Sequence, residues 1–165
     1  MTQLVHSINV QANIKELVKI KHQIYHDLIR RRVTFMPGAC ELVNDLKDRY
    51  VLALSTSSTK ECADIILKKL QIEDIFDAVA TGDDVREGKP HPEIYHLIRR
   101  MLEIASSECL VLEDTENGVN SAKNAGMWCI AVPNQYTKHG NFSRANLIVK
   151  SLTDVNHHLL NSFTK

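Results

Sequence analysis

The sequence predicts an α/β fold with a doubly wound parallel sheet, preceded by a helical segment. Two observations support this prediction. Short unbroken apolar runs, such as those at residues 50–55 and 109–113, are typical of strands that are buried on both faces. These runs alternate with stretches in which apolar residues recur at helical spacing, and the alternation indicates a parallel sheet with helices on both sides.

The expected elements follow in order along the chain. Residues 13–32 form one amphipathic helix, because Asn13 and Glu16 have the spacing of a capping box and the basic residues 30–32 suit the negative end of the helix dipole. A Met-Pro-Gly segment at 36–38 then breaks the chain. Further helices are expected at 39–48, 59–70, 92–104, 117–125 and 152–163, and strands at 50–55, 78–81, 109–113, 128–132 and 147–149.

The composition excludes several classes of protein. Lys plus Arg and Asp plus Glu each number 20 in 165 residues, and the zero net charge argues against a broad surface for nucleic acid or anionic membranes. No apolar run is long enough to cross a membrane, and the N-terminus lacks the pattern of a secretory signal. The four cysteines form no C-x-x-C pair, which favours free thiols over structural zinc and predicts a cytoplasmic location.

Polar side chains follow three of the expected strands at their carboxyl ends, where ligands bind in sheets of this kind. The first strand runs into hydroxyl residues at 55–59, which could hold a phosphate oxygen or simply cap the next helix. Lys89 lies in a Gly-Lys-Pro-His-Pro loop after the second strand and could neutralise a phosphoryl group or face solvent. Glu113 and Asp114 close the third strand and could hold Mg²⁺ or cap a helix.

The three clusters together are more specific than any one of them. Hydroxyls, a lysine and an acidic pair at successive strand ends are the parts of a phosphoryl-transfer site, in which catalysis rests on positioning and charge neutralisation. A phosphoacceptor receiver domain uses similar groups, but its paired acids precede the hydroxyl in the chain. Here Thr56 comes before both Asp83-Asp84 and Glu113-Asp114.

Three stretches carry a resemblance to a known family, and they read VLALSTSSTKE, IFDAVATGDDVREGKPHPEIY and CLVLEDTENGVNSAKNAGMWCIAVPN. In order and spacing they resemble the haloacid dehalogenase (HAD) superfamily, in its branch of sugar-phosphate phosphatases and β-phosphoglucomutase-like enzymes. The resemblance implies a partial α-helical cap over residues 1–36 and a Rossmann-like core over residues 37–165.

The resemblance also implies roles for the polar clusters. Thr56 and Lys89 would be the catalytic residues that hold the phosphoryl group, and Ser57 would join them in binding substrate. Asp114 and Glu113 would be the acids of the Mg²⁺ site, with Asp114 the better candidate for a direct ligand. The substrate would be a small phosphorylated molecule, a sugar phosphate in this branch.

One motif of the family has no counterpart in this sequence. The family's nucleophile is an aspartate in an Asp-x-Asp motif on the first strand, and no Asp-x-Asp occurs here. We therefore expect a truncated chain that starts within the cap and is inactive alone. That strand is central in the family's sheet, so its two neighbours would need self-association or a complementing N-terminal segment to pair their edges.

Two functions remain open from the sequence. The first is a Mg²⁺-dependent phosphomonoester hydrolase or phosphomutase whose nucleophile lies outside these residues. The second is a non-catalytic remnant that binds a phosphorylated ligand or a partner protein. His22 and His26 lie four residues apart on the first helix, but no third ligand is near them in sequence, so we expect a surface or packing role for both.

Overall fold

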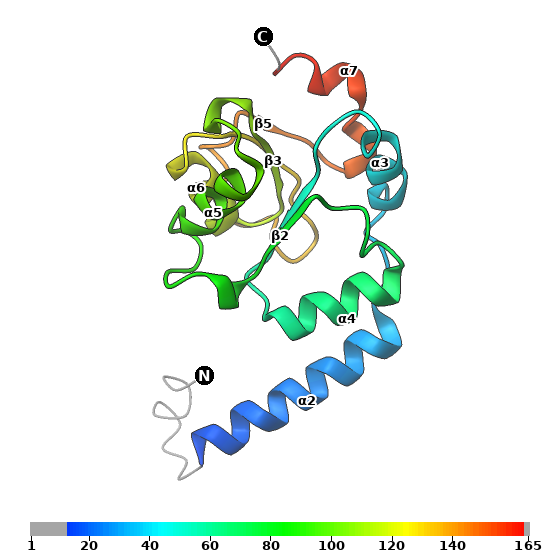
Figure 1. Ribbon diagram of the computed structural model, residues 1–165, viewed down its shortest axis with the longest axis vertical. Helices are drawn as coiled ribbons and strands as arrows, with labels where there is room; N and C mark the ends of the chain where they lie inside the picture. Colours follow the sequence, from blue (N-terminus) through cyan, green and yellow to red (C-terminus); the bar gives the residue numbers. More distant parts are fainter. Residues whose placement is uncertain (1–12, 164–165) are drawn as a thin grey trace.

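A computed structural model describes residues 13–163 (Figure 1). The first helix, α2, spans Ile14–Arg32, and Asn13 caps it by accepting a hydrogen bond from Glu16 N at 3.4 Å, as the capping-box spacing predicts. Most of the α2 surface is exposed, and its buried residues are His26 and Ile29. The predicted cap at 1–36 and core at 37–165 remain a prediction, and residues 1–12 lie outside the described residues.

The remaining elements alternate as the sequence predicts. The helices are α3 (Ala39–Leu46), α4 (Lys60–Leu70), α5 (Glu93–Leu102), α6 (Glu116–Asn124) and α7 (His157–Leu160). The strands are β1 (Ala53–Ser55), β2 (Ala78–Ala80), β3 (Leu110–Glu113), β4 (Trp128–Ala131) and β5 (Leu147–Ile148). Short 3₁₀ turns lie at Gly82–Asp84, Ser106–Glu108 and Leu152–Asp154. Among the described helices, none combines the length and apolar character needed to cross a membrane.

The closing helix expected at 152–163 is wrong in its extent. A 3₁₀ turn at Leu152–Asp154 comes first, and a separate four-residue helix, α7, follows it. Asn156 explains the break, because its side chain accepts a hydrogen bond from Leu159 N at 3.0 Å and so starts a new helix.

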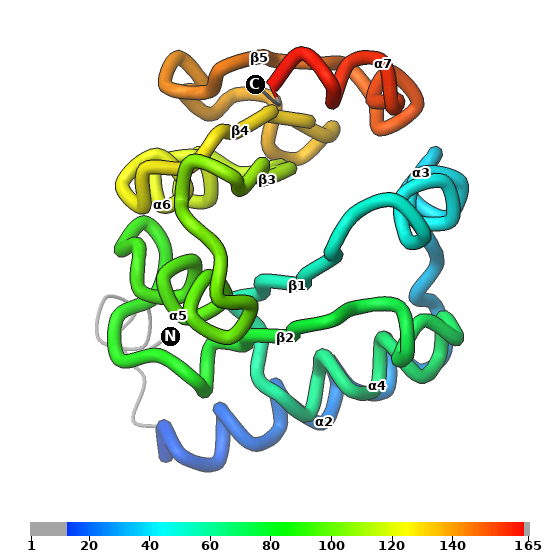
Figure 2. The backbone as a smooth tube through the Cα atoms, turned by 45° about the horizontal axis from the view of Figure 1, so that its top comes forward, coloured from blue at the N-terminus to red at the C-terminus, as the bar shows by residue number. Residues whose placement is uncertain are grey.

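The strands form two parallel sheets instead of one. β1 pairs with β2, and β3 pairs with β4, which in turn pairs with β5. Figure 2 shows β1 and β2 in the lower part of the molecule and the other three strands above them. Among the described strands, none pairs with both β1 and β3.

Two apolar cores pack on opposite faces of the strands. One lies under α5 and α6 and includes Ile94, Tyr95, Ile98, Val119 and Cys129. The other lies between the strands and helices α3 and α7, and it includes Leu42, Leu46, Ile130, Val155 and Leu160. Helices cover both faces, so the doubly wound α/β prediction is confirmed as a fold class.

Candidate functional site

The end of β1 leads directly into the hydroxyl-rich turn that precedes α4. Thr56 N donates to Ala80 O at 3.0 Å, which ties this turn to β2. Thr59 is the N-cap residue of α4, and its hydroxyl accepts a hydrogen bond from Cys62 N at 3.4 Å. Thr56 Oγ1 accepts from Ser58 N at 3.1 Å, and Ser57 is exposed. The Thr56 and Ser57 side chains are therefore not needed to cap the helix.

Lys89 joins the ends of two strands that belong to different sheets. Its ammonium Nζ lies 3.4 Å from the carbonyl oxygen of Ser55, the last residue of β1. It also forms an ion pair with the Glu113 carboxylate at the end of β3, and the two side chains are only 9% and 8% exposed. The predicted lysine and the predicted acidic pair thus lie together at the carboxyl ends of β1 and β3.

Tyr95 is a third member of this buried cluster. Its hydroxyl donates to Glu113 Oε1, and Lys89 Nζ lies 4.9 Å from the centre of its ring. Burial first, and then the charge of Glu113, raise the pKa of the Tyr95 hydroxyl well above its ordinary value. Tyr95 therefore keeps its proton and acts as a hydrogen-bond donor to the carboxylate.

Asp114 lies beside this cluster but in a different environment. It is exposed, and Asn134 Nδ2 donates to its Oδ2 at 2.8 Å. Partial burial of the carboxyl, and then the neighbouring charge of Glu113, raise the pKa of Asp114 above its ordinary value. Of the two predicted metal ligands, Asp114 is the more exposed residue, whereas Glu113 is buried and its carboxylate contacts Lys89 and Tyr95.

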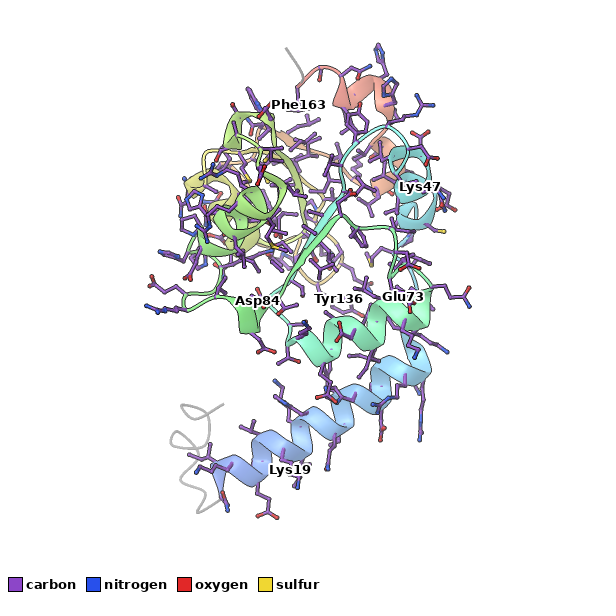
Figure 3. The ribbon with its side chains drawn as sticks, in the orientation of Figure 1. Lys19, Lys47, Glu73, Asp84, Tyr136 and Phe163 are labelled. Atoms are coloured by element: carbon purple, nitrogen blue, oxygen red, sulfur yellow. The ribbon has the colours of Figure 1, made fainter. Side chains whose placement is uncertain are left out.

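Two further polar residues, Asp84 and Tyr136, lie in the segments that follow β2 and β4. Asp84 accepts hydrogen bonds from the Thr81 backbone N at 2.8 Å and from the Thr81 hydroxyl at 2.6 Å. Tyr136 lies in the loop after β4 and is 84% exposed. Figure 3 shows both residues on the side of the core that faces α4. The Asp84 carboxylate is therefore already hydrogen-bonded within the turn after β2.

Among the described residues, one group of three possible metal ligands lies elsewhere. Glu87, His91 and Glu93 offer ligand atoms that all lie within 4.8 Å of one another, on the loop before α5 and at the first residue of that helix. Glu93 already accepts from the backbone N of Arg86 and of Glu87, at 3.2 and 3.0 Å. This group contains neither Glu113 nor Asp114, so it is separate from the predicted Mg²⁺ site.

The histidines of α2 pack as the sequence predicts. His26 is buried, its Nε2 lies 3.2 Å from Cys62 Sγ, and its Nδ1 lies 3.3 Å from the Glu61 carboxylate. The His22 and His26 rings lie 6.3 Å apart. His26 therefore fastens α2 to α4.

Comparison with known proteins decides the family. Residues 1–132 match the family model described as haloacid dehalogenase-like hydrolase. The chain belongs to this family. It is 32% identical over 147 residues to the protein CbbY of Rhodobacter capsulatus, a match that covers 86% of this chain and 65% of that protein. It is 30% identical over 151 residues to the β-phosphoglucomutase of Bacillus subtilis, covering 90% and 65%.

A solved structure agrees with this membership of the HAD family. The crystal structure of a CbbY variant from Rhodobacter sphaeroides, in complex with xylulose-(1,5)bisphosphate, superimposes with a TM-score of 0.82 at 29% identity. The superposition covers 89% of this chain and 68% of that one. The chain spans 65% of the length of each of the two curated HAD relatives described above.

Three residues of this candidate site were not predicted from the sequence. Tyr95 lies three residues before the buried Ile98 on α5, and a buried tyrosine needs a polar partner, so helical spacing could have placed it. Gly118 is needed because a Cβ there would lie 1.8 Å from Glu113 Oε2. No sequence pattern indicates Asn134, because it contacts Asp114 from a loop 20 residues further along the chain.

Proposed function

We propose that the strand ends form the phosphate-binding and metal-binding part of a HAD phosphoryl-transfer site, in a phosphomonoester hydrolase or phosphomutase. The observation that supports this most strongly is the position of Lys89. Its ammonium contacts both the Ser55 carbonyl and the Glu113 carboxylate, and so it draws together the ends of β1 and β3. Thr56 and Asp114 are the residues that directly follow those two ends.

In this proposal the phosphoryl group binds between the turn after β1 and Lys89. The Thr56 and Ser57 hydroxyls donate hydrogen bonds to its oxygens, and the N-terminus of α4 adds favourable backbone dipoles. Lys89 supplies positive charge where negative charge develops in the transition state. Tyr95 and Glu113 act as positioning residues, since their contacts hold the Lys89 side chain in place.

The donor set at the end of β3 fits a hard divalent cation. Mg²⁺ prefers few carboxylates and completes its shell with water and phosphate oxygens. Asp114 would hold the ion, because its carboxylate is exposed and a nearby cation would offset the effects that raise its pKa. Glu113 would support the site through Lys89. When bound, the cation would neutralise charge on the phosphoryl oxygens.

The substrate class that we propose is a phosphorylated sugar. The Bacillus relative is named a β-phosphoglucomutase, and the structural neighbour was crystallised with a sugar bisphosphate. About a third of each of these two proteins lies outside the match, so the identity of the sugar does not follow from these comparisons.

Calorimetric titration tests the phosphate site directly. The 165-residue chain with Mg²⁺ should bind β-glucose 1-phosphate, and Thr56→Val should weaken binding about tenfold, since one hydrogen bond to a charged group contributes about 1.5 kcal/mol. The matched control is Ser143→Ala, which removes an exposed hydroxyl on the loop before β5. Equal affinities for all three proteins would contradict the assignment of Thr56.

The metal site is tested in the same way. Asp114→Asn should abolish the Mg²⁺ dependence of phosphate binding, because it removes the exposed carboxylate. Asp64→Asn removes an exposed carboxylate on α4 and should leave that dependence intact. A Mg²⁺ dependence that survives Asp114→Asn would show that the ion binds elsewhere.

A binding function without catalysis is the second candidate, and the absence of Asp-x-Asp from the sequence favours it. Turnover of p-nitrophenyl phosphate with Mg²⁺ separates the two candidates. Turnover that Asp114→Asn abolishes would show a complete enzyme and a nucleophile of another kind. Binding of the sugar phosphate without turnover would assign ligand binding alone to these 165 residues.

A further inference from the structure

The loop that carries Lys89 is held by two side chains of α6. Ser121 Oγ donates to the carbonyl oxygen of His91 at 2.7 Å, and Asn124 Nδ2 donates to the carbonyl oxygen of Pro90 at 3.1 Å. These two carbonyl groups belong to the residues that directly follow Lys89 in the chain. Figure 1 shows α6 beside α5, the helix that follows this loop. One helix therefore binds two consecutive carbonyl groups of the lysine loop.

The backbone of this loop does little to fix its own path. Pro90 and Pro92 have no N–H to donate. His91 N donates to Gly88 O at 3.0 Å. In the described part of the chain, the carbonyl groups of Pro90 and His91 accept hydrogen bonds from side chains and not from the backbone. The conformation that follows Lys89 thus depends on the donors that α6 supplies.

Ser121 is placed to make this contact and no competing one. It is fully buried in α6, with 0% of its surface exposed. A serine inside a helix can donate to the carbonyl group four residues earlier in the same helix. Here the hydroxyl donates to the separate segment that contains His91. Because buried polar groups need partners, the Ser121 hydroxyl and the His91 carbonyl satisfy each other.

The orientation of the Asn124 amide is fixed from its other side. Arg144 Nη2 donates to Asn124 Oδ1 at 2.9 Å, and Arg144 Nη1 donates to Asn120 Oδ1 at 3.1 Å. Since the amide oxygen of Asn124 faces the arginine, its NH₂ group faces Pro90 O. Asn124 therefore contacts the loop as a donor in a fixed direction.

The same helix also holds the acidic side of the proposed site. α6 begins directly after its N-cap residue Thr115, whose hydroxyl lies 3.3 Å from Glu113 Oε2. Gly118, in the first turns of α6, leaves the space that the Glu113 carboxylate occupies. The start of α6 thus contacts the acid that pairs with Lys89, and its later turns contact the loop that carries Lys89. The position of the lysine relative to the acidic pair depends on this one helix.

We propose that Ser121 and Asn124 are positioning residues that place the Lys89 ammonium at the strand ends. This inference rests on the proposed function, because it assigns two further residues to the same site. Neither side chain contacts the phosphoryl group, and both act through the loop. Loss of either donor leaves a loop carbonyl without its partner. The loop then moves, and Lys89 keeps its contacts with Ser55 O and Glu113 for a smaller fraction of the time.

The placement of Lys89 can be measured without any ligand. Its side chain is 9% exposed and paired with Glu113, so an amine-acylating reagent such as sulfosuccinimidyl acetate should label it slowly. Ser121→Ala and Asn124→Asp each remove one donor to the loop. We expect each variant to raise the labelling rate of Lys89 at least threefold relative to that of the exposed Lys60, as read by peptide mass spectrometry.

A matched variant and an internal reference separate positioning from general loosening. Asn120→Asp makes the same change of charge on α6, beside the same Arg144, at an amide outside the loop contacts described above. It should leave the labelling of Lys89 unchanged. Cys129 is fully buried in the core under α6, so iodoacetamide reports any general opening. We expect it to stay unlabelled in all three variants.

Calorimetry with Mg²⁺ and β-glucose 1-phosphate then relates the placement of Lys89 to the proposed site. Ser121→Ala and Asn124→Asp should weaken binding about three- to tenfold, since the ammonium is held less well near the phosphoryl group. Asn120→Asp should bind as tightly as the wild type. The labelling and binding measurements are independent, so the inference and the proposed function can fail separately.

Two results would overturn the inference, whatever the affinities are. The first is a labelling rate of Lys89 that neither Ser121→Ala nor Asn124→Asp changes. The second is a rise that Cys129 shares, because the core would then have opened as a whole. Faster labelling of Lys89 with unchanged phosphate affinity would instead contradict the proposed function, since the lysine would be positioned by α6 without contributing to phosphate binding.

Discussion

Lys89 and Glu113 form a buried ion pair that connects the loop before α5 to the end of β3, with side chains 9% and 8% exposed. A carboxylate buried without its partner costs far more than the intact pair contributes. Lys89→Met should therefore lower the free energy of unfolding by about 3–5 kcal/mol in urea denaturation. The control Lys60→Met changes an exposed lysine and should cost little.

The double variant Lys89→Met/Glu113→Gln distinguishes a lost charge pair from lost packing. It removes the uncompensated charge, so it should be more stable than Lys89→Met alone. Equal stability of the single and double variants would show that the charge of Glu113 contributes nothing to the cost.

Gly118 should be intolerant of even one methyl group. In a helix interior, Gly→Ala normally gains up to about 1 kcal/mol. At Gly118 the added Cβ would lie 1.8 Å from Glu113 Oε2, and that carboxylate is tied to Lys89 and Tyr95. We expect Gly118→Ala to be destabilising by about 1–3 kcal/mol. Gly88→Ala is the matched control, because nothing lies within 4 Å of its added Cβ.

Asp84 should give the protein a pH-dependent contribution to stability. The Thr81 hydroxyl, and then the Thr81 backbone N–H, lower the pKa of this carboxyl. Because the pKa of Asp84 is lower in the folded state, its ionised carboxylate stabilises the folded state at pH values above the unfolded pKa of about 3.9. This contribution is lost as the pH falls through the lowered pKa of the folded state. Asp84→Asn should thus lower Tm by about 2–4 °C at pH 7, with a smaller difference at pH 3.

The measurement is a pair of thermal melts at each pH, with Asp64→Asn as the control. Asp64 is exposed on α4, and its replacement should leave Tm unchanged at both pH values. A Tm difference between wild type and Asp84→Asn that is larger at pH 3 than at pH 7 would contradict this prediction.

The four free cysteines should differ in reactivity. Cys129 is fully buried in the core under α6, and burial, with the charge of Glu113, raises the pKa of its thiol to about 12. Burial also raises the pKa of Cys109, whereas Cys40 is half-buried on α3. Iodoacetamide at pH 8 should label Cys40 first and leave Cys129 unmodified, as read by peptide mass spectrometry.

Labelling in urea provides the reference, since all four thiols should then react. Rapid modification of Cys129 in the native protein would mean that the region beneath Glu113 opens readily.

Sequence patterns placed the strand ends correctly because apolar runs and turn residues are local signals. The edge on which Lys89 and Glu113–Asp114 meet follows from parallel topology, which the alternation of helices and strands predicts. The contact of Lys89 with Ser55 O could not be predicted, because it depends on side-chain paths between separate sheets. The strand expected at 50–55 is shorter in the structure: its ladder spans three residues, and among the described strands β1 pairs with β2 alone.

The position of α2 has a consequence for how the molecule comes apart. α2 extends away from the strands, lies along α4, and buries only His26 and Ile29 (Figure 1). Its apolar residues Ile20, Ile24 and Leu28 are 43%, 57% and 47% exposed. An element with so little buried surface opens at a lower free energy than the core does. The amides of α2 should therefore exchange with solvent as a separate cooperative unit, ahead of those in β3 and β4.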